Sequence, residues 1–453
     1  MKKIKSIYTC IVMMVFGLTG IQAQSDLSLN DAITASLAQN FDIRIEQRNV
    51  ELAKLNNNWS ALFPTLTASI QGSHSVFDNR ETLNPFSFLG ETTTDQLQPT
   101  LNLRWDLLSI GNITIGKRQL EQLQAESEGN ADIVIANTVQ SVILGYYIAV
   151  LEKRRLEEFE KQLVLSKDKY DLVRVRQELG TAVTTDLLLE EGNYLTDSAN
   201  YVNQLLIFQN TISNLNFIMG EPEPTRQYNL TDDLVLDTKE LSYDDLNQQM
   251  EAQNVDLKKM YLTQQVLGTN VTLAKWDRYP TLSIGGNYNF TRNNQTIDGD
   301  IFNQEQGGFV PFSASGDNEN IQWGLNFTIS VNLFDKGRIN RAIRESLIRE
   351  ELGQQQLNRM KLSLNRDLVQ ALDRYNIRRS LYEINNRRYE SSQQNLEISE
   401  AKFRNGTINS FDYRTVQNNN LAAATVRLQS IYDLIDSQIT ILRLTGGLMQ
   451  TYN

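Results

Sequence analysis

Two aspartates in matching positions are the residues whose placement points most clearly to a chemical role. Asp186 lies six residues after Gly180, and Asp412 lies six residues after Gly406. A carboxylate repeated around an assembly makes a ring of negative charge, and such a ring attracts cations. Near the start of a helix, the same carboxylate would simply stabilise the helix dipole. The sequence leaves both interpretations open.

Catalytic and metal chemistry have little support in the residue types. His74 is the only histidine, and Cys10 is the only cysteine. Gly307 and Gly308 precede no helix start that could hold a phosphate. We therefore predict no catalytic, metal or cofactor site and no enzyme activity.

The sequence predicts β-strands as well as the helices that carry the two aspartates. Four segments alternate apolar and polar residues, which is typical of strands with one apolar and one polar face. The predicted strands cover residues 65–77, 96–107, 281–291 and 321–333. The stretches 78–95 and 292–320 between paired strands are rich in Asn, Asp, Gly, Thr and Ser, so we expect loops there.

The N-terminus and the net charge restrict the location and the partners. Residues 1–23 combine a basic head, a short apolar run and a small-residue exit, which indicates a secretory signal peptide; a membrane anchor is the alternative. Without the three lysines of this segment, the formal charge changes from −11 to −14, which disfavours nucleic-acid binding. We find no later run of about 18 apolar residues and predict no membrane-spanning helix.

Long helices are expected between the strand pairs. No proline lies between residues 100 and 221 or after 311, and an interior proline would cost about 3 kcal/mol. A helix from 112 to 177 would be about 100 Å long. Gly-Thr pairs near 180 and 406 predict the turns of two helical hairpins, with Thr184 and Ser410 as caps of the returning helices.

The returning helices carry an apolar residue every seven positions, which predicts antiparallel coiled-coil packing. An ordinary amphipathic helix on a globular core is the alternative. The seven-residue series comprises Leu421, Leu428, Ile435 and Leu442 in the second half, and Leu195 and Val202, with Leu205 and Ile212, in the first.

The same order of features occurs twice, which predicts two internal repeats. Asn40 and Asn254 correspond, as do Pro64 and Pro280, and the offset between the halves grows in the second long loop. We expect a first repeat at 24–226 and a second at 227–453. Each contains a helix, a strand pair and a long helical hairpin.

Four strands cannot close a barrel alone, because stable barrels have about eight or more. Two copies of the chain would provide eight strands and a filled interior, and three copies would provide twelve and a wet lumen. The polar face of Thr, Ser, Asn and Gln favours three copies. Lipid would then cover the apolar face.

The ordered set of motifs resembles the TolC-type outer-membrane efflux proteins. It comprises Phe63-Pro64-Thr65-Leu66, Tyr279-Pro280-Thr281-Leu282, Leu179-Gly180-Thr181 and Asn405-Gly406-Thr407. The resemblance covers the chain after residue 23. It implies an α+β membrane protein: a homotrimer with a 12-stranded barrel in the outer membrane of a Gram-negative bacterium and a helical tunnel across the periplasm. It also implies a periplasmic adaptor protein and an inner-membrane pump as partners.

The resemblance also implies roles for the tips of the helical hairpins. Leu179, Gly180, Thr181, Asn405, Gly406 and Thr407 would contact the adaptor, and Asp412, Asp186 and Thr415 would be aperture candidates. The best-known relatives carry two aspartates at the second tip, whereas this chain has Asp412 and then Thr415. Ile408 stands at the position of the family's gating arginine. We therefore expect a single acidic ring.

The expected function is passive conduction from adaptor and pump to the exterior, with cation preference. The net charge and Asp412 support that preference. The alternatives are a periplasmic coiled-coil scaffold or adhesin that never inserts in lipid, and a stand-alone porin. The sequence names neither the cargo nor the pump.

Overall fold

The computed structural model describes residues 25–80, 88–107, 110–234 and 239–451. They divide into two compact units. The helical unit comprises the described parts of Met1–Val50, Ser127–Tyr261 and Leu357–Asn453, and the strand unit comprises those of Glu51–Glu126 and Leu262–Gln356. The predicted signal peptide, residues 1–23, lies outside the described residues.

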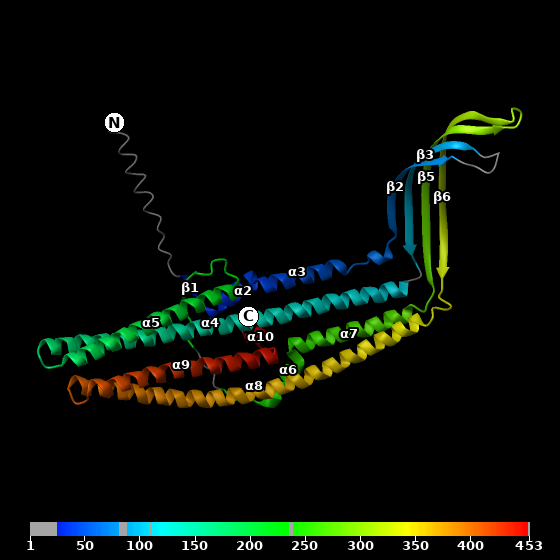
Figure 1. Ribbon diagram of the computed structural model, residues 1–453. Helices are drawn as coiled ribbons and strands as arrows, with labels where there is room; N and C mark the ends of the chain where they lie inside the picture. Colours follow the sequence, from blue (N-terminus) through cyan, green and yellow to red (C-terminus); the bar gives the residue numbers. More distant parts are fainter. Residues whose placement is uncertain (1–24, 81–87, 108–109, 235–238, 452–453) are drawn as a thin grey trace, which may run out of the picture. The chain divides into compact units, whose positions relative to one another are not determined.

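The strand unit holds one antiparallel sheet (Figure 1), in the order β2-β3-β5-β6. Its strands are β2 (Thr65–Asn79), β3 (Leu89–Asp106), β5 (Thr281–Asn303) and β6 (Gly308–Ser330), and the short 3₁₀ helix η2 (Ser60–Leu62) precedes β2. Among the described residues, β2 and β6 each pair on one side only. The sheet therefore has two open edges.

The register gives the sheet two faces of opposite character. Leu66 pairs with Leu103, and Ile284 pairs with Phe327. We call the face that holds these residues the leucine face. The other face holds Thr67, Asn102, Ser283 and Thr328, and we call it the threonine face. The predicted alternation is confirmed over this lower part of the sheet.

The strands are longer than the alternation predicted. Residues 292–320, expected to be a loop, continue β5 and β6 up to a turn at 304–307, and β3 begins at Leu89. Polar cross-strand contacts maintain the pairing there, as in the 2.7 Å ion pair between Arg292 and Asp317. The alternation is interrupted above residue 291 by a polar stretch, so it marks only the lower part of the strands. At its lower end, β6 stops at Ser330 instead of residue 333.

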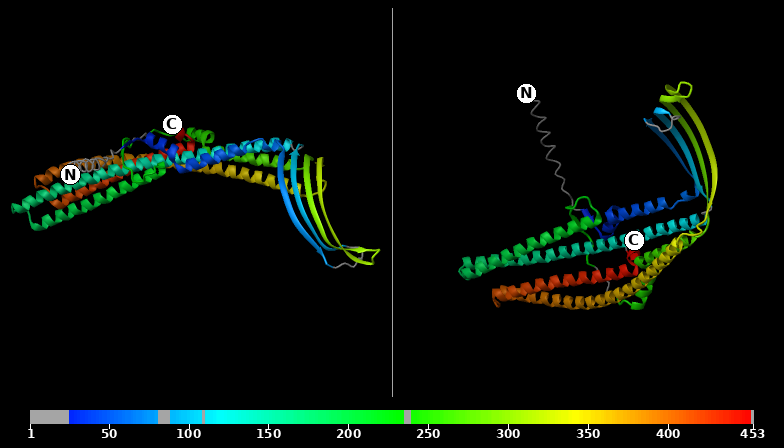
Figure 2. Two further views of the ribbon diagram at one scale, coloured as in Figure 1. Left: turned by 90° about the horizontal axis from the view of Figure 1, so that it is seen from above. Right: turned by 45° about the vertical axis from the view of Figure 1, so that its right-hand side comes forward.

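Two helical hairpins dominate the helical unit (Figures 1 and 2), where α4 lies beside α5 and α8 beside α9. Their bounds are α4 (Ile110–Glu178), α5 (Thr184–Met219), α8 (Arg338–Arg404) and α9 (Ser410–Thr445). Shorter helices are α2 (Leu29–Gln39), α3 (Phe41–Asn56), α6 (Tyr243–Gln253), α7 (Val255–Trp276) and α10 (Leu448–Thr451). The long α4 confirms the helix expected from 112 to 177.

Residues matched between the halves of the sequence make the same contacts. The Asn40 side chain donates to the Ile218 carbonyl at 2.8 Å, and the Asn254 side chain donates to the Leu444 carbonyl at 2.8 Å. Each asparagine also accepts from the backbone amide three residues further on. Each one therefore fixes a break between two helices and ties it to the end of a hairpin.

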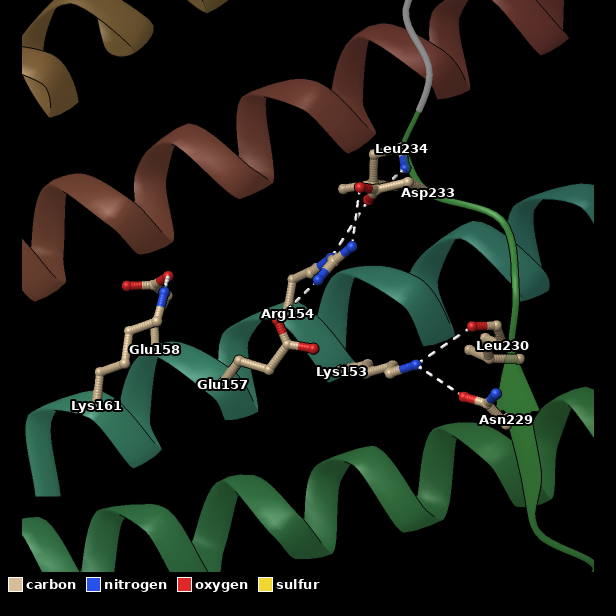
Figure 3. A network of polar contacts seen from close by, with 9 residues as sticks. All are labelled: Lys153, Arg154, Glu157, Glu158, Lys161, Asn229, Leu230, Asp233 and Leu234. Carbon is tan, nitrogen blue, oxygen red and sulfur yellow. Dashed lines mark hydrogen bonds and ion pairs between the residues drawn. The ribbon is translucent and has the colours of Figure 1, made fainter. Parts of the chain in front are cut away.

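A short strap crosses α4 in the helical unit. Its strand β4 (Tyr228–Leu230) pairs in parallel with β1 (Ser25–Leu27). Figure 3 shows that Lys153 of α4 donates to the Leu230 carbonyl, at 3.2 Å, and that Arg154 donates to Asp233, at 2.8 Å. These contacts fix the link between the two halves of the chain on the helical surface.

The apolar part of α4 packs in the core of the helical unit. Val142, Ile143 and Tyr146 are fully buried beside Ile212 and Leu215 of α5. α4 also contains an 18-residue window of mean hydropathy 1.7, long and apolar enough to cross a membrane by length and composition. The prediction of no membrane-spanning helix after residue 23 rested on uninterrupted apolar runs, whereas this window passes by mean hydropathy alone. Within the protein, 44% of the window is buried.

The seven-residue pattern has different outcomes in α9 and α5. In α9, Leu428 and Ile435 are buried as predicted. In α5, Leu195 is 58% exposed and Val202 is 61% exposed, so the prediction that they pack inside the hairpin is wrong for the single chain. Glu190, Asp197 and Gln204, also spaced by seven, face inward instead.

Candidate functional site

Both hairpin tips end their first helix in the same way. Gly180 and Gly406 each have φ of 72°, in the left-handed region that glycine adopts without a steric penalty. The amide and hydroxyl of Thr181 both donate to the Arg176 carbonyl, at 2.8 and 2.9 Å. Thr407 makes the same two bonds to the Lys402 carbonyl, both at 2.9 Å. The Gly-Thr pairs therefore fix two tight, exposed turns.

The returning helices begin differently from the prediction. Val183 is the N-cap of α5 and makes no side-chain cap bond, whereas Asn409 caps α9 by accepting from the Asp412 amide at 2.8 Å. Thr184 and Ser410 are instead the first helical residues. The predicted caps were therefore displaced by one residue, because the turns are one residue shorter than we expected.

The structure places all the predicted site residues at or next to the two tips. Leu179, Gly180, Thr181, Asn405, Gly406 and Thr407 are all exposed. Asp186 and Asp412 are exposed in the first turns of α5 and α9, where a carboxylate complements the helix dipole. Thr415 is exposed too, and its hydroxyl donates to the Phe411 carbonyl at 3.0 Å.

A buried ion pair, which sequence reasoning missed, lies behind the tips. The Lys169 ammonium of α4 lies 3.0 Å from Glu190 of α5, and their side chains are 2% and 1% exposed. Lys169 also donates to the Ser410 carbonyl of α9 at 2.9 Å, and the Ser410 hydroxyl donates to Glu190. One cluster thus joins the α4–α5 hairpin to α9.

A second ion pair lies one heptad further along α5. Arg414 of α9 donates to both carboxylate oxygens of Asp197, at 2.6 and 2.7 Å. Gln162 of α4 also donates to Asp197, at 3.3 Å. The planar guanidinium matches the carboxylate in this two-bond geometry, which is stronger and more directional than a single contact.

A third polar layer follows after another seven residues. Gln204 of α5 donates to the Glu152 carboxylate of α4 at 2.6 Å. Arg155 of α4 pairs with the same carboxylate at 2.8 Å and donates to Gln429 of α9 at 2.6 Å. The inward face of α5 between 190 and 204 is thus a polar stripe, which we call the polar seam, and its residues are Glu190, Asp197 and Gln204.

Aromatic rings close the cluster around Lys169. Phe403 of α8 and Tyr413 of α9 stack with centroids 4.9 Å apart, and the Lys169 ammonium lies 5.2 and 5.5 Å from these centroids. Burial raises the pKa of Tyr413 to about 12. Burial also lowers the pKa of Lys169, although the nearby Glu190 opposes that shift. All four long helices therefore contribute to this cluster.

The seam can hold the two hairpins together or let them separate. Removing one partner of a buried pair leaves an uncompensated charge and costs about 3–5 kcal/mol, whereas separation into water rehydrates both partners. The sequence carried one signal of the seam, the seven-residue spacing of Glu190, Asp197 and Gln204. We read only the apolar residues at that spacing and so missed it.

The described residues also bear on metal binding. Among them, no group of three or more His, Cys, Asp or Glu side chains could hold a metal ion. His74 lies on the strand unit, where its Nδ1 is 2.6 Å from the Asp95 carboxylate, and both side chains are largely exposed.

Comparison with known proteins agrees with this geometry. Residues 246–447 match the family model described as outer membrane efflux protein. Nodulation protein T of Rhizobium leguminosarum bv. trifolii is 23% identical over 205 residues, which is 44% of this chain. The match spans 42% of that relative.

Three solved structures share the fold. The outer-membrane channel OprN is 17% identical, with a TM-score of 0.69 over 92% of this chain and 90% of its own. The CmeC channel of Campylobacter jejuni is 16% identical, with a TM-score of 0.71 over 92% and 85%. The open-state MtrE channel of Neisseria gonorrhoeae is 14% identical, with a TM-score of 0.66 over 92% and 88%. These three proteins are described as outer-membrane channels. The second half of the chain is therefore similar to the outer membrane efflux protein family, and the chain as a whole shares the fold of these channels.

Proposed function

We propose that three copies of this chain form the outer-membrane exit duct of a tripartite efflux or type I secretion system. The observation that carries the proposal is the four-stranded sheet, which has two open edges and one face that is apolar over its lower part. Open edges and an apolar face of this size are both unfavourable in water. Sister chains at the edges and lipid on the leucine face remove both problems at once.

The polar character of the threonine face supports three copies rather than two. Thr65, Thr67, Ser69 and Gln71 of β2 face the same side as Asn287 and Asn289 of β5. Eight strands would leave room only for packed side chains, whereas twelve can enclose water. Polar side chains on this face suit a wet lumen and therefore a 12-stranded barrel.

Exposed apolar residues on the helices support a helical barrel. Leu188, Leu195 and Val202 recur every seven residues on the outside of α5, and Leu362, Val369, Ile377 and Ile384 are exposed on α8. Stripes at this spacing are typical of helices that pack against helices. Sister hairpins would bury them and continue the duct into the periplasm. We also infer that the chain consists of two internal repeats, which share this role.

The polar seam supports a gate at the hairpin tips. A shift of one hairpin relative to the other would open the tip, and it would have to separate Glu190 and Asp197 from their partners. The Gly-Thr turns would receive a periplasmic adaptor, which favours the open arrangement. An inner-membrane pump supplies the energy, and the duct conducts passively. Asp412 beside the aperture would give it cation preference.

Cell fractionation and the mass of the detergent-extracted complex test the proposal. We expect it in the outer-membrane fraction of a Gram-negative host, as a complex with the mass of three chains after detergent extraction. Reconstituted in a planar bilayer, the complex should conduct cations more readily than anions. Recovery in the soluble periplasm would instead support the scaffold or adhesin alternative.

A further inference from the structure

The upper part of the β5–β6 hairpin reverses the polarity of the sheet. The pairing stays in register from Thr281↔Ser330 to Asn303↔Gly308, so each face can be followed from bottom to top. From the pair Arg292↔Glu319 upward, the leucine face gains acidic residues, namely Glu91, Asp298, Asp300, Asp317 and Glu319, and it ends at the turn in the aromatic pair Phe302↔Phe309. The threonine face stays polar up to Gln295 and then becomes apolar, with Ile297, Ile301, Val310, Phe312 and Ala314.

A close contact between backbones gives this region its shape. Gly90 of β3 pairs with Gly299 of β5, and a Cβ on Gly299 would lie 2.1 Å from the Leu89 carbonyl oxygen. The Phe88 ring lies against both glycines, within 3 Å of where their Cβ atoms would be. The hairpin bends away from the line of the lower strands near this level (Figure 2). Phe88 and the threonine-face residues Ile297, Ile301, Val310 and Phe312 form what we call the upper cluster.

The upper cluster lies beyond the part of the sheet that a membrane can cover. A strand crosses an outer membrane in about 9–11 residues, and β5 has 23. The apolar alternation of β5 ends at Phe290, so Arg292 and the residues above it extend past the lipid. The acidic leucine face then meets external water. The apolar upper cluster continues the face that encloses the lumen below.

We propose that the upper clusters of three sister chains pack against one another above the lumen and form an apolar constriction at its outer mouth. The inference rests on the proposed trimeric barrel. A three-fold axis places identical patches around one centre, so each cluster would meet its own copies. The side chains need such a partner, since Phe312 remains 37% exposed in the single chain. Asp298 and Asp300 on the opposite face favour water over lipid on that side of the arm.

The hairpin is long enough to reach the centre. Twelve strands spaced about 4.8 Å apart and tilted about 40° close into a cylinder about 24 Å across, so the axis lies about 12 Å from the wall. The arm of β5 from Arg292 to Asn303 extends about 40 Å at 3.3 Å per residue. An arm of this length can lean over the mouth and still have residues left for contact.

Cysteine cross-linking in the outer-membrane complex tests the contact. Cys10 is the only native cysteine and lies in the predicted signal peptide, so a single new cysteine is an unambiguous probe. Phe312→Cys is on the apolar face, and Ser313→Cys is its neighbour on the acidic face. In complexes whose native mass is three chains, a short bismaleimide should join sister chains severalfold more efficiently at residue 312 than at residue 313.

Channel recordings provide a second readout. Phe312→Ser should raise the single-channel conductance, because it weakens the constriction, whereas Ser313→Ala should leave it unchanged. Three results with intact trimers would overturn this inference but not the proposed trimer. They are equal cross-linking at both positions, cross-linking of residue 312 to a different protein, and wild-type conductance in Phe312→Ser. A complex without three chains would contradict the proposed function as well.

Discussion

Helices α5 and α9 occupy matching places in the two hairpins but turn opposite kinds of residue inward. Glu190, Asp197 and Gln204 form the buried polar seam of α5. The positions 226 residues later in α9 are Val416, Ala423 and Ser430, none of them charged, and Ala423 and Ser430 are buried. The apolar series shows the reverse: Val202 of α5 is exposed, whereas the matching Leu428 of α9 is buried.

This difference fits the proposed gate, in which α5 would move relative to α9. The apolar contacts of α9 stabilise a single packed arrangement, since separating them exposes hydrocarbon to water. The ion pairs of α5 are strong while paired, yet each partner is readily solvated once the hairpins separate. In the proposed trimer, the exposed leucines of α5 would contact a sister chain. In the proposed gate, the α4–α5 hairpin would move while α9 keeps its apolar contacts.

The largest expected effect comes from breaking the seam at one partner. Arg414→Ala leaves Asp197 buried and unpaired, and should lower the free energy that holds the tip closed by about 3–5 kcal/mol. Hydrogen exchange of the α5 and α9 amides near the tip should accelerate accordingly. Arg349→Ala removes an exposed pair with Glu345 and should cost less than about 1 kcal/mol.

Removing both charges sharpens this test. The double variant Asp197→Ala and Arg414→Ala should be less destabilised than Arg414→Ala alone, because no charge is left unpaired. If the two substitutions were additive, the ion pair would not be the contact that holds the hairpins together.

The two heptad leucines should respond differently to truncation. Leu428→Ala removes a buried side chain and should destabilise the fold by about 2–5 kcal/mol in chemical denaturation. Leu195 is exposed, so Leu195→Ala should change the unfolding free energy of the single chain by only about 0.5 kcal/mol, and the milder Leu195→Val by no more than that. Leu195→Ala should instead weaken assembly, measured as the fraction of trimer on dilution in detergent. Equal unfolding penalties would remove the contrast between α5 and α9.

Alkaline pH should loosen the aromatic part of the α9 contact. The pKa of Tyr413 is raised to about 12 in the folded chain, against about 10 when unfolded. A raised folded pKa gives stability that is complete below pH 10 and is lost as pH rises to 12. The loss is on the order of 3 kcal/mol. The unfolding free energy of Tyr413→Phe should therefore fall less than that of the wild type between pH 10 and 12. An equal fall in the two proteins would show that Tyr413 is not the group responsible.

The smallest effect concerns selectivity at the tip. Asp412→Asn should partly reduce the cation preference of reconstituted channels, measured as the reversal potential in a salt gradient. Asp186→Asn tests whether the first tip contributes equally. Clear anion preference in the unaltered channel would refute the role assigned to Asp412.

Local sequence patterns predicted most helices, turns and lower strands. The buried ion pairs could not be predicted, because several of their contacts join residues that are distant in the sequence. Gly180 and Gly406 marked the turns because a left-handed residue must follow such helices. The lower strands could be predicted because their apolar residues stay on one face. In residues 292–320 the apolar residues are fewer and lie mainly on the other face, so the alternation is interrupted and the segment resembles a loop. Lys169 and Arg414 lie hundreds of residues from some of their contacts, and nothing local indicates that they are buried. The seven-residue spacing of Leu195 and Val202 predicted packing but could not say which surface they pack against, and both are exposed in the single chain.

The number of chains in the assembly is the most direct test of the account. Native mass spectrometry of the complex extracted from outer membranes should give three copies, which supplies twelve strands and covers both open edges of the sheet. Two copies would provide eight strands and no wet lumen, and a monomer would leave the edges of β2 and β6 uncovered. Either result would contradict the proposed duct.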